Sequence, residues 1–383
     1  MKQMGLAPDH ATYNTMINAH CKEGNLEKAV KLWHEMKSYG LLPNSITCNS
    51  IVGGFCKAGN LNGGMGLLNE MVALGFYPNS VTHRLVLEAC SQSNRADTVF
   101  EMHERLLEMG LKQDRMIYNT LITILCRLRM TRKASYVLED MTRRGISADT
   151  ITYNALIHGY CKGSHLKKAF STFSQMSVEG VSPNVATYNI LLGGLSTTGL
   201  MQEADVLVDE MKKRGLVPNA STYNILVSGH GKKGNKKESM KLYCEMITKG
   251  FVPSTGTFNV LISDFSKVGK MDQARELLNE MQMRGVSPNS STYDVLISGW
   301  CKLSNQPELK RFSKLSYQSE AKRLLEEMNE KGFVPCESTR FCISGAFARP
   351  GKKGAARRLL ETLYKGKEGK NKVTFTNRNE HVR

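Results

Sequence analysis

The sequence lacks the features that would assign it to a common class of enzyme or membrane protein. No segment approaches the ~18 consecutive apolar residues that a membrane-spanning helix needs. Ten cysteines are present, but no two form a C-x-x-C pair, and the H-x-E signature of a zinc deaminase is also missing. The glycine pairs Gly53-Gly54 and Gly193-Gly194 fall inside helical patterns and not after a strand, so neither forms a phosphate-binding loop. We therefore predict that the protein is not an enzyme and holds no cofactor or metal.

Acidic residues are scarce relative to basic ones. The 52 Lys and Arg residues exceed the 35 Asp and Glu residues, so the formal net charge is +17. A charge of this sign and size favours a polyanionic partner, either nucleic acid or an anionic membrane surface. Residues 1–9 show no apolar core and no Arg/Ser-rich presequence, so no targeting segment is visible in them.

An aromatic residue followed by asparagine recurs along the chain at multiples of 35 residues. The pairs are Tyr13-Asn14, Tyr118-Asn119, Tyr153-Asn154, Tyr188-Asn189, Tyr223-Asn224 and Phe258-Asn259. Eight consecutive repeats of 35 residues therefore run from 10 to 289 without an insertion or deletion. Residues 1–9 are interpreted as the end of a truncated repeat. A ninth repeat, 290–336, holds 12 extra residues around 305–316, where Pro307 predicts a loop.

The chain after residue 336 departs from the repeat pattern. Residues 337–364 form a degenerate terminal repeat, and residues 365–383 are a basic tail of low hydrophobicity that we expect to be disordered.

Each repeat contains two apolar stripes with helical spacing. In the fifth repeat the first stripe runs from Tyr153 to Tyr160 and the second from Leu166 to Met176. Gly180 and Pro183 then end the second helix. Neither helix can bury its stripe alone, so neighbouring repeats must stack. We predict an all-α fold, a right-handed α-solenoid (superhelix) of stacked helix–turn–helix repeats.

Cysteines and methionines also recur once per repeat. Their positions predict buried packing groups and not disulfides or metal ligands, which implies a reducing compartment. The cysteines are Cys21, Cys56, Cys126, Cys161 and Cys301, and the methionines are Met36, Met71, Met141, Met176, Met211, Met246 and Met281.

The asparagine of the repeated pair lies on the opposite side of its helix from the apolar stripe. At 100° per residue, Asn154 falls near Ile151, His158 and Lys162, away from Tyr153. A cation follows eight residues after this position in seven repeats. These cations, the cation row, are Lys22, Lys57, Arg127, Lys162, Lys232, Lys267 and Lys302.

One amide and one cation per repeat match a polymer with one base and one phosphate per step, because an amide can bind a base edge and a cation can neutralise a phosphate. The alternative is that the asparagine caps the helix. Thr152 and its equivalents are the better predicted caps, which favours a ligand-binding role for the asparagine.

The repeats resemble pentatricopeptide repeats, in particular the plain 35-residue type found in plant organelle RNA-binding proteins. The resemblance rests on TYNALIHGYCK at 152–162, the Gly and Ala that follow it, the Met before Gly, and the closing Pro-Asn or Pro-Ser, and it covers residues 10 to 360. The W-x-x-L-G-x-x-Y signature of tetratricopeptide repeats is absent. The resemblance implies that each repeat binds one base of single-stranded RNA.

The resemblance also implies which side chains recognise the base, namely the amide after the aromatic residue and the last residue of the repeat. Asn119 with Asp149 implies uracil, and Asn224 with Ser254 implies cytosine. The remaining pairs, which imply a pyrimidine with cytosine above uracil, are Asn14 with Asn44, Asn49 with Asn79, Asn154 with Asn184, Asn189 with Asn219, and Asn259 with Asn289. The cation row implies contacts with the RNA backbone.

Two repeats depart from this pattern, since the third pairs Arg84 with Asp114 and the ninth pairs Asp294 with Cys336. The family also places a branched aliphatic residue three positions before the asparagine, as a wedge between stacked bases. The chain has this residue at Ile46, Val81 and Ile151 but has Ala11, Ala186, Ser221, Gly256 and Ser291 elsewhere. We expect these five wedges to hold bases poorly.

The sequence as a whole predicts a protein that binds pyrimidine-rich single-stranded RNA, one base per repeat, in organelle RNA processing, stability or translation. We expect a monomer with no membrane partner, acting beside other RNA-processing proteins. The expected location is the mitochondrion, with the chloroplast as the alternative. The alternative function is a protein–protein interaction scaffold on the same solenoid.

Overall fold

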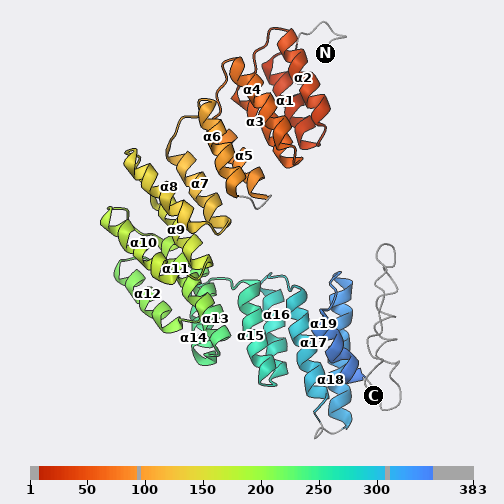
Figure 1. Ribbon diagram of the computed structural model, residues 1–383. Helices are drawn as coiled ribbons and strands as arrows, with labels where there is room; N and C mark the ends of the chain where they lie inside the picture. The colour runs from red at the N-terminus through yellow and green to blue at the C-terminus, as the bar shows by residue number, and fades with distance from the viewer. Residues whose placement is uncertain (1–7, 93–95, 307–310, 348–383) are drawn as a thin grey trace, which may run out of the picture. The chain divides into compact units, whose positions relative to one another are not determined.

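The computed structural model describes residues 8–92, 96–306 and 311–347, which form nineteen α-helices and no strand (Figure 1). The chain divides into two compact units, one ending at Thr198 and the other beginning at Gly199. We call them the N-terminal and C-terminal units.

The N-terminal unit holds eleven helices. They are α1 (His10–Lys22), α2 (Leu26–Ser38), α3 (Ser45–Lys57), α4 (Leu61–Ala73), α5 (Ser80–Gln92), α6 (Ala96–Glu108), α7 (Arg115–Arg127), α8 (Thr131–Arg143), α9 (Thr150–Lys162), α10 (Leu166–Val178) and α11 (Val185–Thr198). The C-terminal unit holds the other eight that the described residues form. They are α12 (Met201–Lys213), α13 (Ala220–Lys233), α14 (Lys236–Thr248), α15 (Thr255–Lys267), α16 (Met271–Met283), α17 (Ser290–Ser304), α18 (Arg311–Glu330) and α19 (Glu337–Phe347).

The helices pack in the order that stacked repeats require. The first helix of a repeat contacts its own second helix, as α9 contacts α10, and also the first helix of the next repeat, as α7 contacts α9 and α15 contacts α17. This pattern holds within each unit and confirms the predicted all-α solenoid of helix–turn–helix repeats. Among the described residues, no helix is both long and apolar enough to cross a membrane.

The recurring apolar residues form the core, as predicted. Each methionine of the series is fully buried, and the five recurring cysteines are buried, unbridged thiols. Burial raises the pKa of Cys126 to about 12. A side chain added at Gly159 would lie 2.7 Å from the Cys126 sulfur, so a small thiol packs against a glycine of the next repeat. The first helices of consecutive repeats approach closely at this contact.

Among the described residues, the turns follow the glycine pattern with two exceptions, one of which is Arg129 between α7 and α8, with a φ of +61°. Gly180 adopts a φ of +76°, which suits glycine because it has no side chain to clash in this conformation. Between α9 and α10, however, Ser164 and not Gly163 takes the left-handed conformation, with a φ of +60°.

The prediction that Thr152 and its equivalents cap the first helices is wrong. The N-cap of α9 is Asp149, whose side chain accepts a hydrogen bond from the Thr152 backbone N–H at 3.0 Å. Thr152 is the third residue of the helix, and its hydroxyl oxygen accepts a hydrogen bond from the Asp149 backbone N–H at 3.1 Å, which completes a capping box. Asp, Asn or Ser occupies this cap in most of the other repeats, whereas Cys336 precedes α19. These caps include Asp9, Asn44, Asp114, Asn219, Ser254 and Asn289.

The loop predicted for residues 305–316 is also partly wrong. The second helix of the ninth repeat, α18, begins at Arg311, so the last six residues of this segment are helical. The added turns pack, because the Tyr317 ring lies 5.4 Å from the Trp300 ring and Gln318 donates to the Ala346 carbonyl at 2.6 Å. Residues 307–310 lie outside the described residues, as do 1–7 and the predicted basic tail.

Candidate nucleic-acid interface

The asparagines predicted to recognise bases are half-buried between the first helices of consecutive repeats, less exposed than the sequence suggested. In five of them the carbonyl oxygen accepts a hydrogen bond from the threonine hydroxyl of the following repeat. The distances are 2.7 Å for Thr82 to Asn49, 2.5 Å for Thr152 to Asn119, 2.6 Å for Thr257 to Asn224 and 2.7 Å for Thr292 to Asn259, and Thr47 donates in the same way to Asn14. The amide carbonyl is therefore held by the fold, and the NH₂ group is left as the donor.

The structure brings several predicted pairs into contact. The Asn119 amide donates to the Asp149 carboxylate at 3.2 Å, and the Asn259 amide donates to the Asn289 carbonyl at 3.1 Å. In the seventh repeat the Ser254 backbone N–H donates to Asn224 at 2.9 Å. These contacts fix the orientation of both side chains before any ligand arrives.

Two other pairs are arranged differently. In the fifth repeat the Asn154 carbonyl oxygen is buried without a hydrogen-bond partner among the described residues, and Asn184 accepts from the Thr187 N–H at 3.0 Å. Asn189 lies in the N-terminal unit and Asn219 in the C-terminal unit, where Asn219 caps α13.

Several neighbouring groups determine the ionisation of the cap residue Asp149. Burial opposes its ionisation, but hydrogen bonds from the Thr152 backbone and hydroxyl and from Asn119 outweigh this effect and lower the pKa of the Asp149 carboxyl. Arg115 adds a weaker attraction at 3.9 Å. Asp149 is therefore a carboxylate at neutral pH and can only accept hydrogen bonds.

The cation row is exposed to solvent. All seven side chains are exposed at or near the C-terminal ends of the first helices. Lys267 lies 3.8 Å from Asp264, and among the described residues the other six have no acidic partner. Unpaired cations on a row of parallel helices can bind successive phosphates.

The wedge position contains one residue that the sequence reasoning missed. Met116 stands three residues before Asn119 and is 63% exposed, as much as Ile151 at 63% and Ile46 at 62%. Methionine is unbranched, so a search for branched residues passes over it, although its spacing would have found it. Four consecutive repeats, the second to the fifth, therefore present a large apolar side chain, with Val81 as the fourth member.

The third repeat carries a different set of side chains. Arg84 is exposed and forms an ion pair with Glu88 at 3.3 Å, and Asp114 caps α7. His83 replaces the usual tyrosine, is fully buried, and lies 3.0 Å from the His103 ring nitrogen. Within the described residues, Arg84 and Asp114 are not hydrogen-bonded to each other as Asn119 and Asp149 are.

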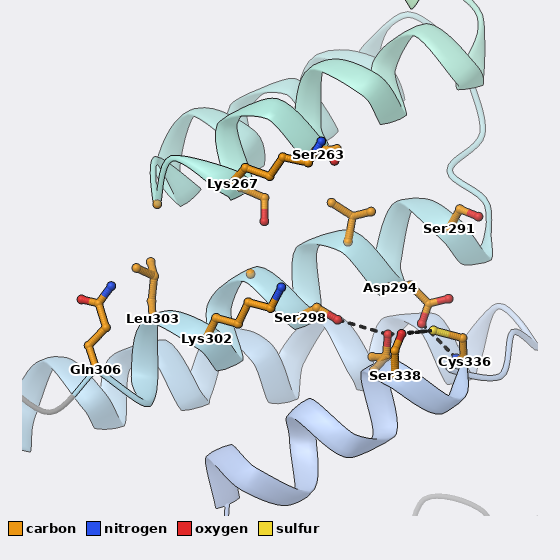
Figure 2. Close-up of a pocket in the computed structure, with 15 residues that line it drawn as sticks. Ser263, Lys267, Ser291, Asp294, Ser298, Lys302, Leu303, Gln306, Cys336 and Ser338 are labelled. Carbon is orange, nitrogen blue, oxygen red and sulfur yellow. Dashed lines mark hydrogen bonds between the residues drawn. The ribbon is translucent and has the colours of Figure 1, made fainter. Parts of the chain in front are cut away.

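The ninth repeat forms one wall of an open cavity of about 630 Å³ in the C-terminal unit (Figure 2). Lys267 from α15, Lys302 and Asp294 from α17, and Cys336 before α19 line it. The predicted pair is in contact, since the Cys336 backbone N–H donates to Asp294 at 3.0 Å. Within the described residues, no cluster of three or more His, Cys, Asp or Glu side chains could hold a metal ion.

Known proteins share this architecture. The chain is similar to the crystal structure of the pentatricopeptide repeat protein PPR10 from maize, with 21% identity and a TM-score of 0.58 over 96% of this chain and 60% of that one. It is also similar to PPR10 in complex with an 18-nt psaJ RNA element, with 22% identity and a TM-score of 0.50 over 94% of this chain and 65% of that one. The chain thus spans less than two thirds of the length of these relatives. No curated protein sequence matches it.

The model of the PPR repeat family matches most of the chain. The matches overlap and cover residues 8–57, 43–92, 113–162, 148–197, 188–232, 218–267 and 253–302. The chain therefore belongs to the PPR repeat family.

Proposed function

We propose that the protein binds single-stranded RNA along its first helices, with one base at each repeat. The observation that carries this proposal is the repeated hydrogen-bond network. In the fourth and eighth repeats it holds an asparagine NH₂ group beside a capping Asp or Asn, with an exposed cation two turns further along the same helix. Family membership and the RNA-bound PPR10 relative support the proposal.

The cap residue would choose the base through its hydrogen-bonding groups. Asp149 offers only acceptors, which suits the N3–H donor of uracil. An asparagine at the cap also offers donors, which suit the N3 acceptor of cytosine. On this basis repeats one to eight prefer pyrimidine, pyrimidine, an unassigned base, uracil, pyrimidine, pyrimidine, cytosine and pyrimidine, with the N-terminal repeats toward the 5′ end.

The biological role would follow from occupation of the RNA. The chain would protect, remodel or mark a pyrimidine-rich segment for other RNA-processing proteins in the mitochondrion or the chloroplast, with no catalytic step of its own. A monomer suffices for this role, because one chain presents all the repeats.

The test is a competition between RNA oligonucleotides for the purified protein. A single-stranded RNA with the proposed base order should bind more tightly than a purine-rich strand of the same length and than the same sequence in duplex form. Equal competition by purine-rich and pyrimidine-rich strands would contradict base recognition. Absence of any RNA binding would favour the protein–protein scaffold.

A further inference from the structure

The ninth repeat presents a carboxylate where seven other repeats present an amide. Asp294 occupies the position of Asn259 and its equivalents on the first helix of the repeat. It is half-buried on α17, at the edge of the cavity between α15, α17 and α19 (Figure 2).

The hydrogen bonds around Asp294 differ from those of the amide repeats. In the eighth repeat, Thr292 donates to the Asn259 carbonyl at 2.7 Å and the Asn259 NH₂ group remains a donor. In the ninth repeat the equivalent threonine, Thr339, is engaged instead with Ser298 at 3.2 Å and with the Cys336 sulfur at 3.2 Å. Asp294 accepts from the Cys336 backbone N–H at 3.0 Å and is approached by the Ser290 hydroxyl at 3.4 Å.

The two contacts leave acceptor capacity on both carboxylate oxygens, because an ionised carboxylate has about four lone-pair sites. The hydrogen-bond polarity of this repeat is therefore the reverse of the amide repeats. A base here must supply donors, and an acceptor atom facing Asp294 would be repelled.

The space around Asp294 suits a two-ring base. The neighbouring residues of the cavity wall are small, with Ser291 at the wedge position of the ninth repeat, Ser338 at that of the tenth, and Ser298 one turn after Asp294. Lys267 from α15 and Lys302 from α17 both line the cavity, and Figure 2 shows the Lys302 side chain extending from α17 toward α15. The carboxylate would meet the base edge, and these two lysines would meet the phosphates on either side.

We propose that the ninth repeat selects guanine through Asp294, an assignment that rests on the proposed RNA-binding function. Guanine carries two adjacent donors, N1–H and N2–H₂, on its Watson–Crick edge, and a carboxylate accepts both. Uracil, cytosine and adenine each offer one donor on that edge beside at least one acceptor. The bound RNA would therefore run through eight mostly pyrimidine positions and end with guanine at the ninth.

The test uses the full chain and nine-base RNAs that differ only in the ninth base, measured by equilibrium binding. We expect guanine to bind about 5- to 100-fold more tightly than each of the other three, the discrimination typical of a good bidentate contact. The Asp294→Asn variant restores the amide of the other repeats and should lose the guanine preference in favour of a pyrimidine. Asp272→Asn, which changes an exposed carboxylate on α16, is the matched control and should keep the preference.

The outcomes separate this assignment from the function on which it rests. If changes at the first eight positions alter affinity but the ninth base has no effect, or a pyrimidine is preferred there, the guanine assignment is overturned and RNA binding stands. If no RNA binds, the proposed function and the guanine assignment both fail. The four-base comparison on the unmodified protein decides the question even if the Asp294→Asn variant does not fold.

Discussion

The two units are built from the same kind of repeat but differ in the side chains that their first helices present at the wedge position. The N-terminal unit exposes Ile46, Val81, Met116 and Ile151, with exposed fractions from 40% to 63%. The C-terminal unit has only serine or glycine there, at Ser221, Gly256 and Ser291. Large exposed apolar side chains in a row are costly to leave in water and gain from contact with the faces of bases.

If RNA binds as proposed, base recognition and binding strength would depend on different side chains along this solenoid. The amide and cap network is present in both units, as Asn119 with Asp149 and Asn259 with Asn289 show. The C-terminal unit would therefore discriminate bases by hydrogen bonds and hold them chiefly by charge. The N-terminal unit would add apolar contact with the bases.

Removal of the cation row, which has members in both units, should have the largest effect on RNA binding. Four of its members lie in the N-terminal unit and three in the C-terminal unit. At about −0.7 per phosphate contact, log K should fall with log[salt] at a slope of roughly −5 for the intact row. Alanine at all seven positions should abolish RNA binding at physiological salt without unfolding the protein.

Separate removal of the N-terminal and the C-terminal cations of the row tests this prediction in more detail. Removing the four N-terminal cations should leave a slope of roughly −2, and removing the three C-terminal cations should leave roughly −3. A matched control changes seven exposed cations of the second helices to alanine. These are Lys28, Lys31, Arg132, Lys167, Lys212, Lys213 and Lys237. If the control lowers affinity as much as the cation row does, total charge and not the row binds RNA.

The wedge residues should give the next largest effect, and only in the N-terminal unit. Changing Ile46, Val81, Met116 and Ile151 to alanine should weaken RNA binding by about 1 kcal/mol per site, since each loses two to three buried carbons at ~0.8 kcal/mol per buried CH₂ with partial burial. The melting temperature should change little, because these side chains are exposed without ligand. Isothermal titration with single-stranded RNA measures the loss.

The reciprocal change gives the C-terminal unit the apolar wedge residues that it lacks. Isoleucine at Ser221, Gly256 and Ser291 should raise the affinity for RNA. The control removes exposed apolar residues elsewhere, at Val178, Val206, Val217 and Met283, with no expected effect on RNA binding. Unchanged affinity in both wedge variants would mean that bases do not stack on these side chains.

Acid should destabilise the N-terminal unit selectively, because its third repeat buries a histidine pair. Burial first, and then the neighbouring His103, lower the pKa of His83 to about 3, and burial also lowers the pKa of His103, where Arg144 and Asp140 act in opposite directions. The unfolded chain takes up protons below about pH 6.5 while the folded pair stays neutral, so this stability is present above pH 6.5 and is lost as pH falls.

At pH 5 the loss attributable to His83 should be about 2 kcal/mol. Urea unfolding followed at pH 7 and pH 5 measures it. His83→Tyr, which restores the residue found in most repeats, should remove most of the pH dependence, whereas His34→Gln, on an exposed surface, should not. An equal pH dependence in the His83→Tyr variant would assign the acid sensitivity to other groups.

The smallest effect is a change of base preference at one position. Asp149→Asn should shift the fourth base from uracil toward cytosine at a cost of about 1–2 kcal/mol at most, typical of one exchanged hydrogen bond. Stability should hold, because asparagine caps a helix about as well as aspartate. Competition among RNAs that differ only at the fourth base measures the shift, and a variant that keeps its uracil preference would separate Asp149 from base choice.

The sequence predicted the fold closely because its period is strict. The positions of Tyr153, Leu156 and Met176 recur every 35 residues with mostly apolar side chains on helical faces, and only stacking can bury such faces. The caps were misassigned because threonine, asparagine and aspartate all favour the start of a helix, and spacing alone does not show which of them lies outside it. The capping box needs Asp149 outside and Thr152 inside.

The start of the second helix in the ninth repeat could not be predicted from the sequence for a different reason. Pro307 favours a break, but the residues after it have the composition of an amphipathic helix, and contact with Trp300 and Ala346 extends α18 toward its start. Such contacts depend on residues distant in the sequence. The same holds for the threonine hydroxyls that anchor the asparagines, since each bond joins residues 33 positions apart.

The double role of the cap residue limits how the specificity of this protein can evolve. Asp149, Ser254 and Asn289 each cap the start of a helix and also lie beside the asparagine proposed to contact a base. Replacing such a cap by an apolar residue costs about 0.5–2 kcal/mol of stability. New base preferences can therefore arise freely only among the few polar side chains that also start helices, and a mutation outside that group would have to be compensated elsewhere in the repeat.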